Sequence, residues 1–340
     1  MNIALLAPLY YPIAEPYRGG LEMHTHLLAR ELTTAGHRVT LFAHPESDAT
    51  LNVVPVPLAR KTGFWSYGRA IRGALRQVAA GGFDVVHNNA IHFLPPLYAR
   101  RLPCPVVTTL HTPPYRAFRL TSALARRYPG HHYVAISRHL ARRWAGLTGG
   151  AAPVIHNGID TAHWPFSAAG RSRTAFWYGR LSPEKGVEFA VAAARRAGYE
   201  LDLAGPINDR AYFDRAVAPL LGGAVRYVGH LDQAAIATRL GRAAVALVTP
   251  VWDEPFGLVY LEALACGTPV AGFAGGAAAE IITPEVGTLV PRGDIRALAQ
   301  VLGEVERRKE RAACRRRVAE HFPARLMTER YLALYARVAR

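Results

Sequence analysis

The stretch VALVTPVWDEPFGLVYLEALACGTPVA, residues 245–271, contains the pattern that decides the fold. Four apolar residues at 245–248 are typical of a buried strand, and a polar loop separates them from an apolar helix predicted at 256–265. Pro255 near its start and Gly267 after its end bracket this helix, of about a dozen residues, and a second strand is predicted at 269–271. A strand, a covering helix and another apolar strand are the repeating unit of a parallel sheet.

The same alternation extends over the rest of the chain, which at 340 residues is longer than single hydrophobic cores usually grow. The segment 157–173 interrupts it and is predicted to be a linker. Continuous apolar strands separated by helices indicate parallel sheets covered on both faces, so we expect an α/β protein with two doubly wound domains. The predicted domains are 1–160 and 161–322, followed by a C-terminal helix at 323–340 that crosses back onto the first domain. The remaining predicted strands are 2–7, 39–43, 85–87, 106–110, 133–136, 154–156, 175–178, 201–204 and 225–228. The remaining predicted helices are 21–35, one that runs from Ser137 toward Trp144, 187–197 and 232–240, and the segment 294–340 is also predicted to be helical.

The composition excludes several classes of protein. Three cysteines cannot form a dense disulfide framework, and no CxxC or zinc-ribbon spacing is present. No apolar run approaches the roughly 18 residues that a membrane span needs, and the N-terminus lacks a signal-peptide pattern. We therefore expect a cytoplasmic protein without a membrane-spanning helix.

Charge is distributed unevenly. The chain has 41 Lys and Arg against 25 Asp and Glu, a net charge of +16. Residues 51–150 contain 14 of the basic residues and a single acid, Asp84. Such a segment attracts polyanions, whether nucleic acid, anionic lipid or a phosphorylated ligand. A general preference for arginine explains the excess equally well, but it does not explain the clustering.

Two loops that follow predicted strands have the composition of phosphate sites. Gly19 and Gly20 precede a helix, where bare backbone N–H groups and the helix dipole favour an anion. In the loop at 178–186, Arg180 offers a planar fork and Lys185 a point charge, which suits a diphosphate. The alternative explanations are that the glycine pair only forms a turn and that the two basic side chains are solvated surface charges. Neither GxGxxG nor GxxxxGK[ST] is present, which disfavours a nicotinamide oxidoreductase.

Further polar residues stand near strand ends. Glu254 is predicted at the mouth of the 256–265 helix, and Glu262 about two turns inside it, where a carboxylate needs hydroxyl or cationic partners. A glycosidase pair is the weaker interpretation, because these carboxylates lie at different depths of one helix. His111 directly follows the strand at 106–110. The Gly275-Gly276 pair before Glu280 indicates only a turn. The absence of a DxD triplet favours neutralisation by protein cations over an obligatory metal.

Taken together, these motifs resemble those of the retaining glycosyltransferases of family 4, and they span nearly the whole chain. That family has the GT-B fold, two facing Rossmann-like domains with a cleft between them. The pair of glutamates separated by seven residues is the most specific element. The matching stretches are GGLEMH at 19–24, GHRV at 36–39, His111, AIS at 135–137, NGID at 157–160, GRLSPEKG at 179–186, AGP at 204–206, VGHL at 228–231 and EPFGLVYLEALACGTPV at 254–270.

The resemblance implies a nucleotide-sugar site and a role for each matching residue. Arg180 and Lys185 would hold the donor diphosphate, and Glu254 and Glu262 would bind the hydroxyls of the donor sugar and of the ribose, respectively. His111 would lie near the reacting face of the sugar. Additional donor contacts would come from the backbone of Gly20, Phe256, Gly257, Leu258 and Val259, and from the segment 229–231 that ends at Leu231. The acceptor candidates on the first domain are Tyr17, Glu22, His24 and Arg116.

In that mechanism the leaving diphosphate accepts the proton of the incoming hydroxyl, so neither a metal nor another cofactor is required. We expect a hexosyl group to move from UDP-glucose or UDP-N-acetylglucosamine, with GDP-mannose as the alternative donor. The sequence 275–280 lacks a proline that relatives often have before the glutamate, which leaves the donor sugar open. The acceptor is equally open among a small metabolite, a lipid-linked sugar and a sugar phosphate.

The basic segment 51–150 belongs to the acceptor-side domain and not to the donor site. It points to an anionic acceptor or to contact with the inner face of a membrane. The non-enzyme alternative, a polyanion-binding or nucleic-acid-binding protein, leaves the two glutamates unexplained, and we expect no specific nucleic acid partner.

Overall fold

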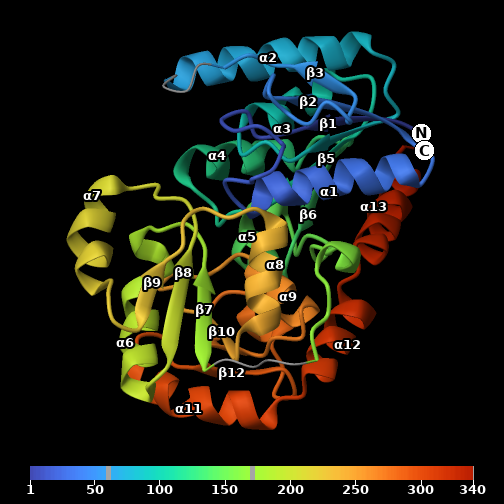
Figure 1. The fold of residues 1–340 in the computed structure, drawn as a ribbon. Helices are drawn as coiled ribbons and strands as arrows, with labels where there is room; N and C mark the ends of the chain where they lie inside the picture. The colour runs from blue at the N-terminus through green and yellow to red at the C-terminus, as the bar shows by residue number, and fades with distance from the viewer. Residues whose placement is uncertain (59–62, 169–172, 340) are drawn as a thin grey trace. The chain divides into compact units, whose positions relative to one another are not determined.

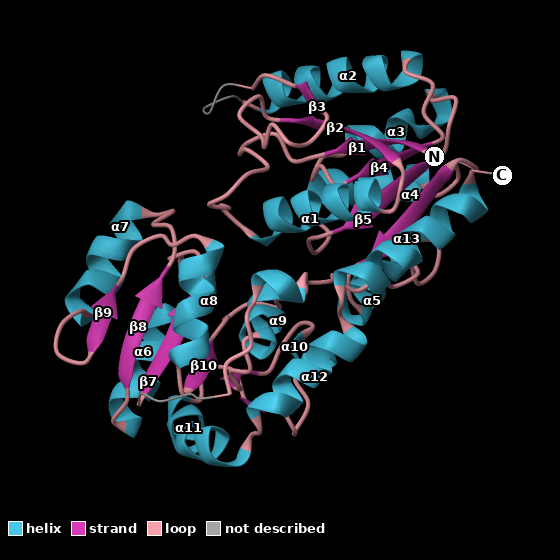
Figure 2. Ribbon diagram, turned by 45° about the vertical axis from the view of Figure 1, so that its right-hand side comes forward, coloured by secondary structure: helices cyan, strands magenta, loops and turns pink. Residues whose placement is uncertain are grey.

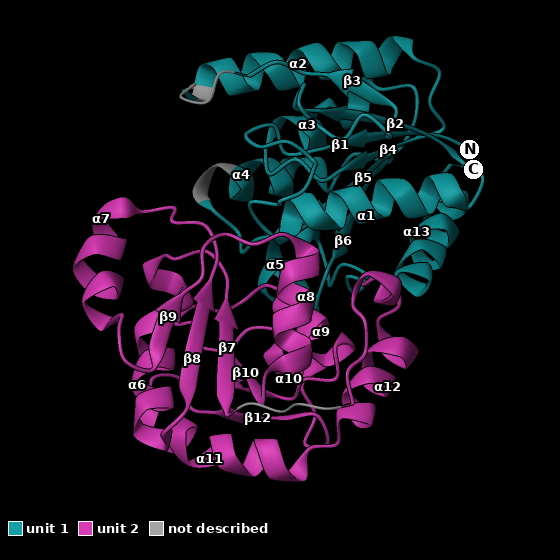
Figure 3. Cartoon of the chain, viewed as in Figure 1, with its two compact units in different colours: residues 1–158, 324–340 teal, residues 159–323 magenta. Residues whose placement is uncertain are grey.

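The computed structural model describes residues 1–58, 63–168 and 173–339 (Figure 1). The chain divides into two compact units, coloured separately in Figure 3. Unit 1 comprises residues 1–158 and 324–340, and unit 2 comprises residues 159–323. The predicted boundaries fell after residues 160 and 322, so Ile159, Asp160 and Pro323 belong to unit 2 instead.

Unit 1 is built on a parallel sheet with the strand order β3-β2-β1-β4-β5-β6. Neighbouring strands pair in parallel throughout, with Leu6 opposite Asn88 where β1 meets β4. Helices cover both faces of the sheet (Figure 2). The strands are β1 (Asn2–Leu6), β2 (Arg38–Ala43), β3 (Val53–Pro55), β4 (Val85–Asn88), β5 (Val106–Leu110) and β6 (His131–Ala135). The helices are α1 (Gly20–Thr34), α2 (Phe64–Ala80), α3 (Leu94–Tyr98), α4 (Arg116–Ala125), α5 (Arg138–Thr148) and α13 (Ala324–Val338).

Alternate residues of the strands supply two hydrophobic layers, because successive side chains point to opposite faces. Ile3 and Leu5 of β1 pack with α1 and with Tyr331 and Tyr335 of α13. Leu6 of β1 packs on the other face, with side chains of α2 and α3. The last helix of the chain is therefore part of the core of unit 1.

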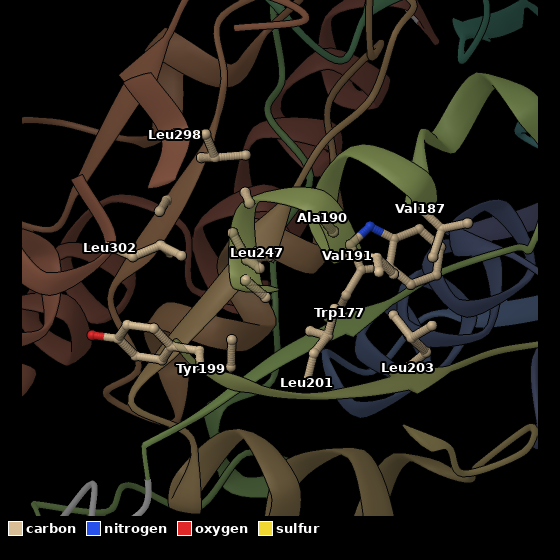
Figure 4. Close-up of a cluster of buried hydrophobic side chains, with 14 of the residues drawn as sticks. Trp177, Val187, Ala190, Val191, Tyr199, Leu201, Leu203, Leu247, Leu298 and Leu302 are labelled. Atoms are coloured by element: carbon tan, nitrogen blue, oxygen red, sulfur yellow. The ribbon is translucent and has the colours of Figure 1, made fainter. Parts of the chain in front are cut away.

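Unit 2 repeats the same strand order, because its sheet reads β12-β11-β10-β7-β8-β9. Its core joins Trp177 and Leu201 to Val187 of α6 and to Leu298 and Leu302 of α11 in one hydrophobic cluster (Figure 4). The strands are β7 (Thr174–Tyr178), β8 (Glu200–Ala204), β9 (Val225–Tyr227), β10 (Val245–Val248), β11 (Val270–Phe273) and β12 (Gly287–Val290). The helices are α6 (Val187–Ala197), α7 (Arg210–Tyr212), α8 (Gln233–Arg242), α9 (Leu258–Ala265), α10 (Ala278–Ile281), α11 (Ile295–Arg308) and α12 (Arg311–His321).

In sheets with this strand order, ligands bind beyond the carboxyl ends of the two central strands, where the winding direction reverses. In unit 1 these strands are β1 and β4, and in unit 2 they are β7 and β10. The loops after β7 and β10 contain Arg180, Lys185 and Glu254. The loop after β1 leads to Gly20, the first residue of α1, and Asn89 directly follows β4. The fold thus brings each group of loops together within its own unit.

Candidate active site

Lys185 and Glu254 join the two central loops of unit 2. The Lys185 Nζ lies 2.6 Å from the Glu254 Oε2, and both side chains are mostly buried. The Trp252 indole N–H donates to the same carboxylate oxygen at 3.1 Å, and the Lys185 ammonium lies 5.5 Å from the centre of the Trp252 ring. A cation and an anion are therefore held side by side at the reversal point of the sheet.

The turn at Gly275-Gly276 positions Glu254, a role that the sequence did not reveal. A Cβ at residue 276 would lie 2.1 Å from the carbonyl O of Glu254 and 2.5 Å from its N, and Gly276 has φ +53°. The Ala277 N–H donates to the Glu254 carbonyl at 3.0 Å. Only glycine permits so close an approach in this backbone conformation. The turn therefore fixes the backbone from which the Glu254 side chain extends.

Helix α9 begins at Leu258, and Gly257 is its N-cap, with φ +89°. The helix has eight residues, so the predicted start at 256 and the length of about a dozen residues were wrong. The left-handed Gly257 turns the chain sharply before the helix, and the Phe256 ring before it is buried. The N–H groups of the first turn, including those of Leu258 and Val259, point toward the N-terminus of the helix, which favours an anion.

Glu262 lies one turn inside α9 rather than the predicted two turns. The residue is 6% exposed, and its carboxylate accepts a short hydrogen bond from the Tyr178 hydroxyl at the end of β7. Tyr178 also contacts the Val259 carbonyl at 3.1 Å. Burial raises the pKa of Glu262 to about 7, and the Tyr178 hydrogen bond opposes this rise. The buried carboxylate thus has one protein hydroxyl as a partner and retains capacity to accept others.

The raised pKa of Glu262 predicts a pH-dependent stability. The folded state keeps this proton up to about pH 7, whereas the unfolded chain loses it near the ordinary value of 4.5. The stabilisation is therefore complete below pH 4.5 and is lost as the pH rises to 7, by roughly 3 kcal/mol. We expect Glu262→Gln to gain about this much unfolding free energy over the parent between pH 4.5 and 8, measured by urea unfolding.

The control for this prediction is Tyr178→Phe, which keeps the carboxylate and removes the hydrogen bond that lowers its pKa. In that variant the loss of stability should extend to higher pH. A difference between Glu262→Gln and the parent that stays constant with pH would contradict the prediction.

The other predicted donor residues of unit 2 lie on neighbouring loops. Arg180 follows β7, and its side chain is 42% exposed and 3.8 Å from Glu184. Leu231 is half-buried in the loop between β9 and α8. That loop meets the loop after β8, since the Gly205 N–H donates to the Gly229 carbonyl at 2.9 Å. The loops that follow β7, β8 and β9 therefore lie at the same edge of the sheet as Glu254.

In unit 1, His111 follows β5 directly and contacts residues of two other elements. Its Nε2 lies 2.9 Å from the Oδ1 of Asn89, which follows β4. Its ring packs edge-on against His24 of α1 at 5.0 Å. Burial lowers the pKa of His111 well below its ordinary value and that of His24 to about 4, so both rings are neutral at pH 7. Gly20, the first residue of α1, precedes His24 by one turn.

The acceptor candidates differ in their surroundings. The Tyr17 hydroxyl forms a short hydrogen bond with His26 Nδ1, and His26 Nε2 lies 3.1 Å from Asp48, so Tyr17 is part of a polar cluster on unit 1. Glu22 and His24 are buried on α1. The side chain of Arg116, on α4, lies outside the described part of the structure.

No metal site is evident in unit 1 or unit 2 within residues 1–58, 63–168 and 173–339, where no group of three or more His, Cys, Asp or Glu side chains is arranged to hold an ion. In the same ranges no helix is long and apolar enough to cross a bilayer. The three cysteines are buried free thiols. Metal independence stays a prediction.

Known proteins match both units. Residues 18–163 match the family described as Glycosyltransferase Family 4, and residues 159–321 match the family described as Glycosyl transferases group 1. A glycogen synthase of Mycobacterium tuberculosis is 31% identical over 393 residues, covering 95% of this chain and 91% of that protein. The chain belongs to glycosyltransferase family 4. The family 4 assignment, the GT-B fold and the transferase class predicted from the motifs are thereby confirmed.

Two further proteins resemble this family 4 glycosyltransferase. A phosphatidyl-myo-inositol mannosyltransferase of Mycolicibacterium smegmatis is 28% identical and covers 89% of this chain and 84% of its own. The crystal structure of AviGT4, a glycosyltransferase involved in avilamycin A biosynthesis, is 26% identical, with a TM-score of 0.76 and 99% and 98% of the two chains covered. The roles of individual residues in this glycosyltransferase remain proposals.

Proposed function

We propose that this enzyme transfers a hexosyl group from a nucleotide sugar to an acceptor hydroxyl with retention of the anomeric configuration. The observation that supports this most directly is the Lys185–Glu254 pair at the reversal point of unit 2. A diphosphate needs cations, and a sugar ring needs acceptors for its hydroxyl groups. The pair offers one of each beside the N-terminus of α9.

The proposed roles follow from this arrangement. Lys185, Arg180 and the first amides of α9 bind the diphosphate and stabilise its charge as it leaves. Glu254 accepts hydrogen bonds from the transferred sugar. Glu262 accepts them from the ribose, which gives a function to a buried carboxylate that would otherwise be costly. Leu231 and the backbone at 229–230 contact the base.

In unit 1, His111 and Gly20 are the residues with a proposed role in the transfer. A neutral imidazole can exchange hydrogen bonds with the sugar or with the attacking hydroxyl without adding charge. The proton of that hydroxyl passes to an oxygen of the departing phosphate, so the bond to the acceptor forms as the bond to phosphate breaks, on the same face. No protein base and no metal take part.

The proposed donor is UDP-glucose or UDP-N-acetylglucosamine. GDP-mannose is the second candidate, because one relative is named a mannosyltransferase. The decisive experiment is a screen for release of UDP or GDP from a panel of nucleotide sugars, with and without EDTA. Donor-dependent release that resists EDTA supports the proposal, and NMR of the product reports the anomeric configuration. Failure of every nucleotide sugar to bind or react would overturn it.

We also propose that unit 1 contacts an anionic membrane through α4. Unit 1 has 21 Lys and Arg against 7 Asp and Glu, a net charge of +14 out of +16. On α4, Leu120 is 70% exposed and Leu124 is 46% exposed, one turn apart. Arg119, and Arg126 and Arg127 just after the helix, are exposed around them. Apolar side chains bordered by arginines complement an anionic lipid surface.

A flotation assay tests this surface. We expect binding to vesicles with anionic lipid at low salt, because each nearby arginine contributes about 1 kcal/mol. The double variant Leu120→Glu with Leu124→Glu should bind roughly tenfold or more weakly, since it loses two apolar contacts and adds repulsion. The control is Phe166→Ser, which removes an exposed aromatic residue of unit 2. Equal binding by both variants, or no binding by the parent, would refute the membrane proposal.

A further inference from the structure

A chain of buried polar side chains lies behind His111 in unit 1. Its central residue is His87 of β4, which is fully buried. The His87 Nε2 lies 2.9 Å from the Asn89 Oδ1 and 2.8 Å from the Thr109 Oγ1. Its Nδ1 forms a short hydrogen bond with the hydroxyl of Tyr335 in α13. The Asn89 Oδ1 in turn contacts His111 Nε2 at 2.9 Å. The C-terminal helix is thereby connected to His111 through two intermediate side chains.

The orientation of the Asn89 amide is determined by Thr25. The Thr25 hydroxyl donates its hydrogen to the Leu21 carbonyl at 2.8 Å, so it can only accept from Asn89, whose Nδ2 lies 3.2 Å away. The Asn89 Oδ1 must then face the two histidines. An amide oxygen only accepts hydrogen bonds, so both imidazoles donate to it from Nε2.

The same logic fixes the protons of His87. Since its Nε2 donates, its Nδ1 is the acceptor, and the Tyr335 hydroxyl supplies the hydrogen bond. Burial lowers the pKa of His87 to about 3, which agrees with a neutral ring. The hydrogen-bond directions from the Tyr335 hydroxyl to the His111 ring are therefore assigned, with the single His87 Nε2–H shared between the Asn89 Oδ1 and the Thr109 Oγ1.

We propose that Asn89 is a positioning residue that holds His111 as the single tautomer with the proton on Nε2, leaving Nδ1 as the acceptor toward substrate. Tyr335 supports it by fixing the ring of His87. The tautomer matters because Nδ1 can then accept a hydrogen bond from a sugar or acceptor hydroxyl. In the other tautomer Nδ1 carries the hydrogen and cannot accept one. This inference rests on the proposed role of His111 in the transfer reaction.

The first test needs no reaction. In protein labelled with 15N at histidine, with His111 identified by its loss in His111→Phe, the parent should show an Nε2-protonated ring at pH 7 that is not averaged between tautomers. An Nδ1-protonated or averaged ring would overturn the inference. Because donor binding plays no part in this measurement, its failure is distinguishable from failure of the proposed function.

The second test reverses the hydrogen-bond logic with Asn89→Asp. A carboxylate beside Nε2–H favours imidazolium, so the Nδ1 acceptor is replaced by a donor until the pH exceeds the new pKa. We expect kcat/KM of Asn89→Asp to be about tenfold or more below the parent at pH 6.5 and to recover as the pH rises toward 9. The donor KM should change little. A pH profile parallel to that of the parent would overturn the inference.

Other groups facing His111 must be excluded as the source of such a profile. His24 on α1 packs directly against His111. His87 on β4 is linked to His111 through Asn89, and Tyr331 and Tyr335 on α13 pack against His87. The 15N spectrum of Asn89→Asp separates them, because the His111 ring should become doubly protonated in the pH range where activity is lost. If another ring titrates there while His111 stays neutral, the assignment to His111 is wrong.

The matched control is Asn88→Asp, one residue earlier on the opposite face of the strand. Asn88 is equally buried, and its side chain contacts the Ala90 N–H at 3.1 Å and Thr108 at 3.3 Å instead of the histidines. Its pH profile should follow that of the parent. If Asn88→Asp and Asn89→Asp shift the profile alike, the effect is a general one of buried charge and the inference fails. Tyr335→Phe should lower kcat a few-fold with an unchanged donor KM.

Discussion

Replacing Glu254 with glutamine is expected to lower kcat/KM by about 100-fold or more, because a group placed to stabilise the transition state loses its charge. The affinity of this variant for UDP should be equal to or higher than that of the parent. The reason is the 2.6 Å contact between Glu254 and Lys185. Once the carboxylate becomes an amide, the ammonium is no longer neutralised and is freer to bind phosphate. Steady-state kinetics and calorimetric titration with UDP measure the two quantities separately.

The control for this change is Glu184→Gln, which alters a carboxylate in the adjacent loop, 3.8 Å from Arg180. It should retain most of the transfer activity. If Glu254→Gln instead abolished both UDP binding and transfer, Glu254 would be supporting the loop rather than acting on the sugar. Thermal unfolding of both variants would show whether the loop had been disrupted.

Lys185→Met is the second change with a large expected effect, because it removes a charged partner of the diphosphate and keeps most of the aliphatic stem. A hydrogen bond to a charged group contributes about 1.5–3 kcal/mol, so the affinity for UDP should fall roughly 10–100-fold. Arg180→Met should have a smaller effect, since its guanidinium is more exposed and better screened. Calorimetry with UDP, repeated at higher salt, measures both losses.

Two comparisons make this prediction specific. Uridine, which lacks the phosphates, should bind the parent and Lys185→Met equally well. Lys309→Met removes a half-buried lysine whose ammonium contacts the Pro284 carbonyl, and it should leave UDP affinity unchanged. Unchanged UDP affinity in both Lys185→Met and Arg180→Met would refute the diphosphate assignment.

Much of the fold could be predicted because its central strands are uninterrupted apolar runs. The strand at 106–110 and the helix at 187–197 agree with β5 and α6 residue for residue. β3 was missed because it has three residues, ends in Pro55 and lies at the sheet edge. β12 was missed because Thr288 and Leu289 are half-buried. The predicted strand at 154–156 was wrong, since its structure is one bridge between Val154 and Ala135.

Only part of the candidate site could be predicted from the sequence. Lys185 and Glu254 could be singled out because each belongs to a local pattern of charged residues, glycines and prolines. The residues that position the site side chains could not be identified in this way. Tyr178 reaches Glu262 across 84 residues, and Tyr335 reaches His87 across 248. Nothing in the sequence near Asn89 indicates that it lies between two histidines, because their proximity depends on how β4, β5 and α13 pack.

The placement of α13 has a consequence for how the chain is made. Unit 2 is continuous from residue 159 to residue 323, whereas unit 1 needs residues 324–340, which are synthesised after all of unit 2. Domains generally fold in the order in which they leave the ribosome. The sheet of unit 1 leaves the ribosome before unit 2, but its core is incomplete until Tyr331 and Tyr335 have been synthesised. Unit 2 is therefore the first of the two units that can fold completely. The hydrogen bond that supports His87, and through it His111, can therefore form only after all of unit 2 has been synthesised.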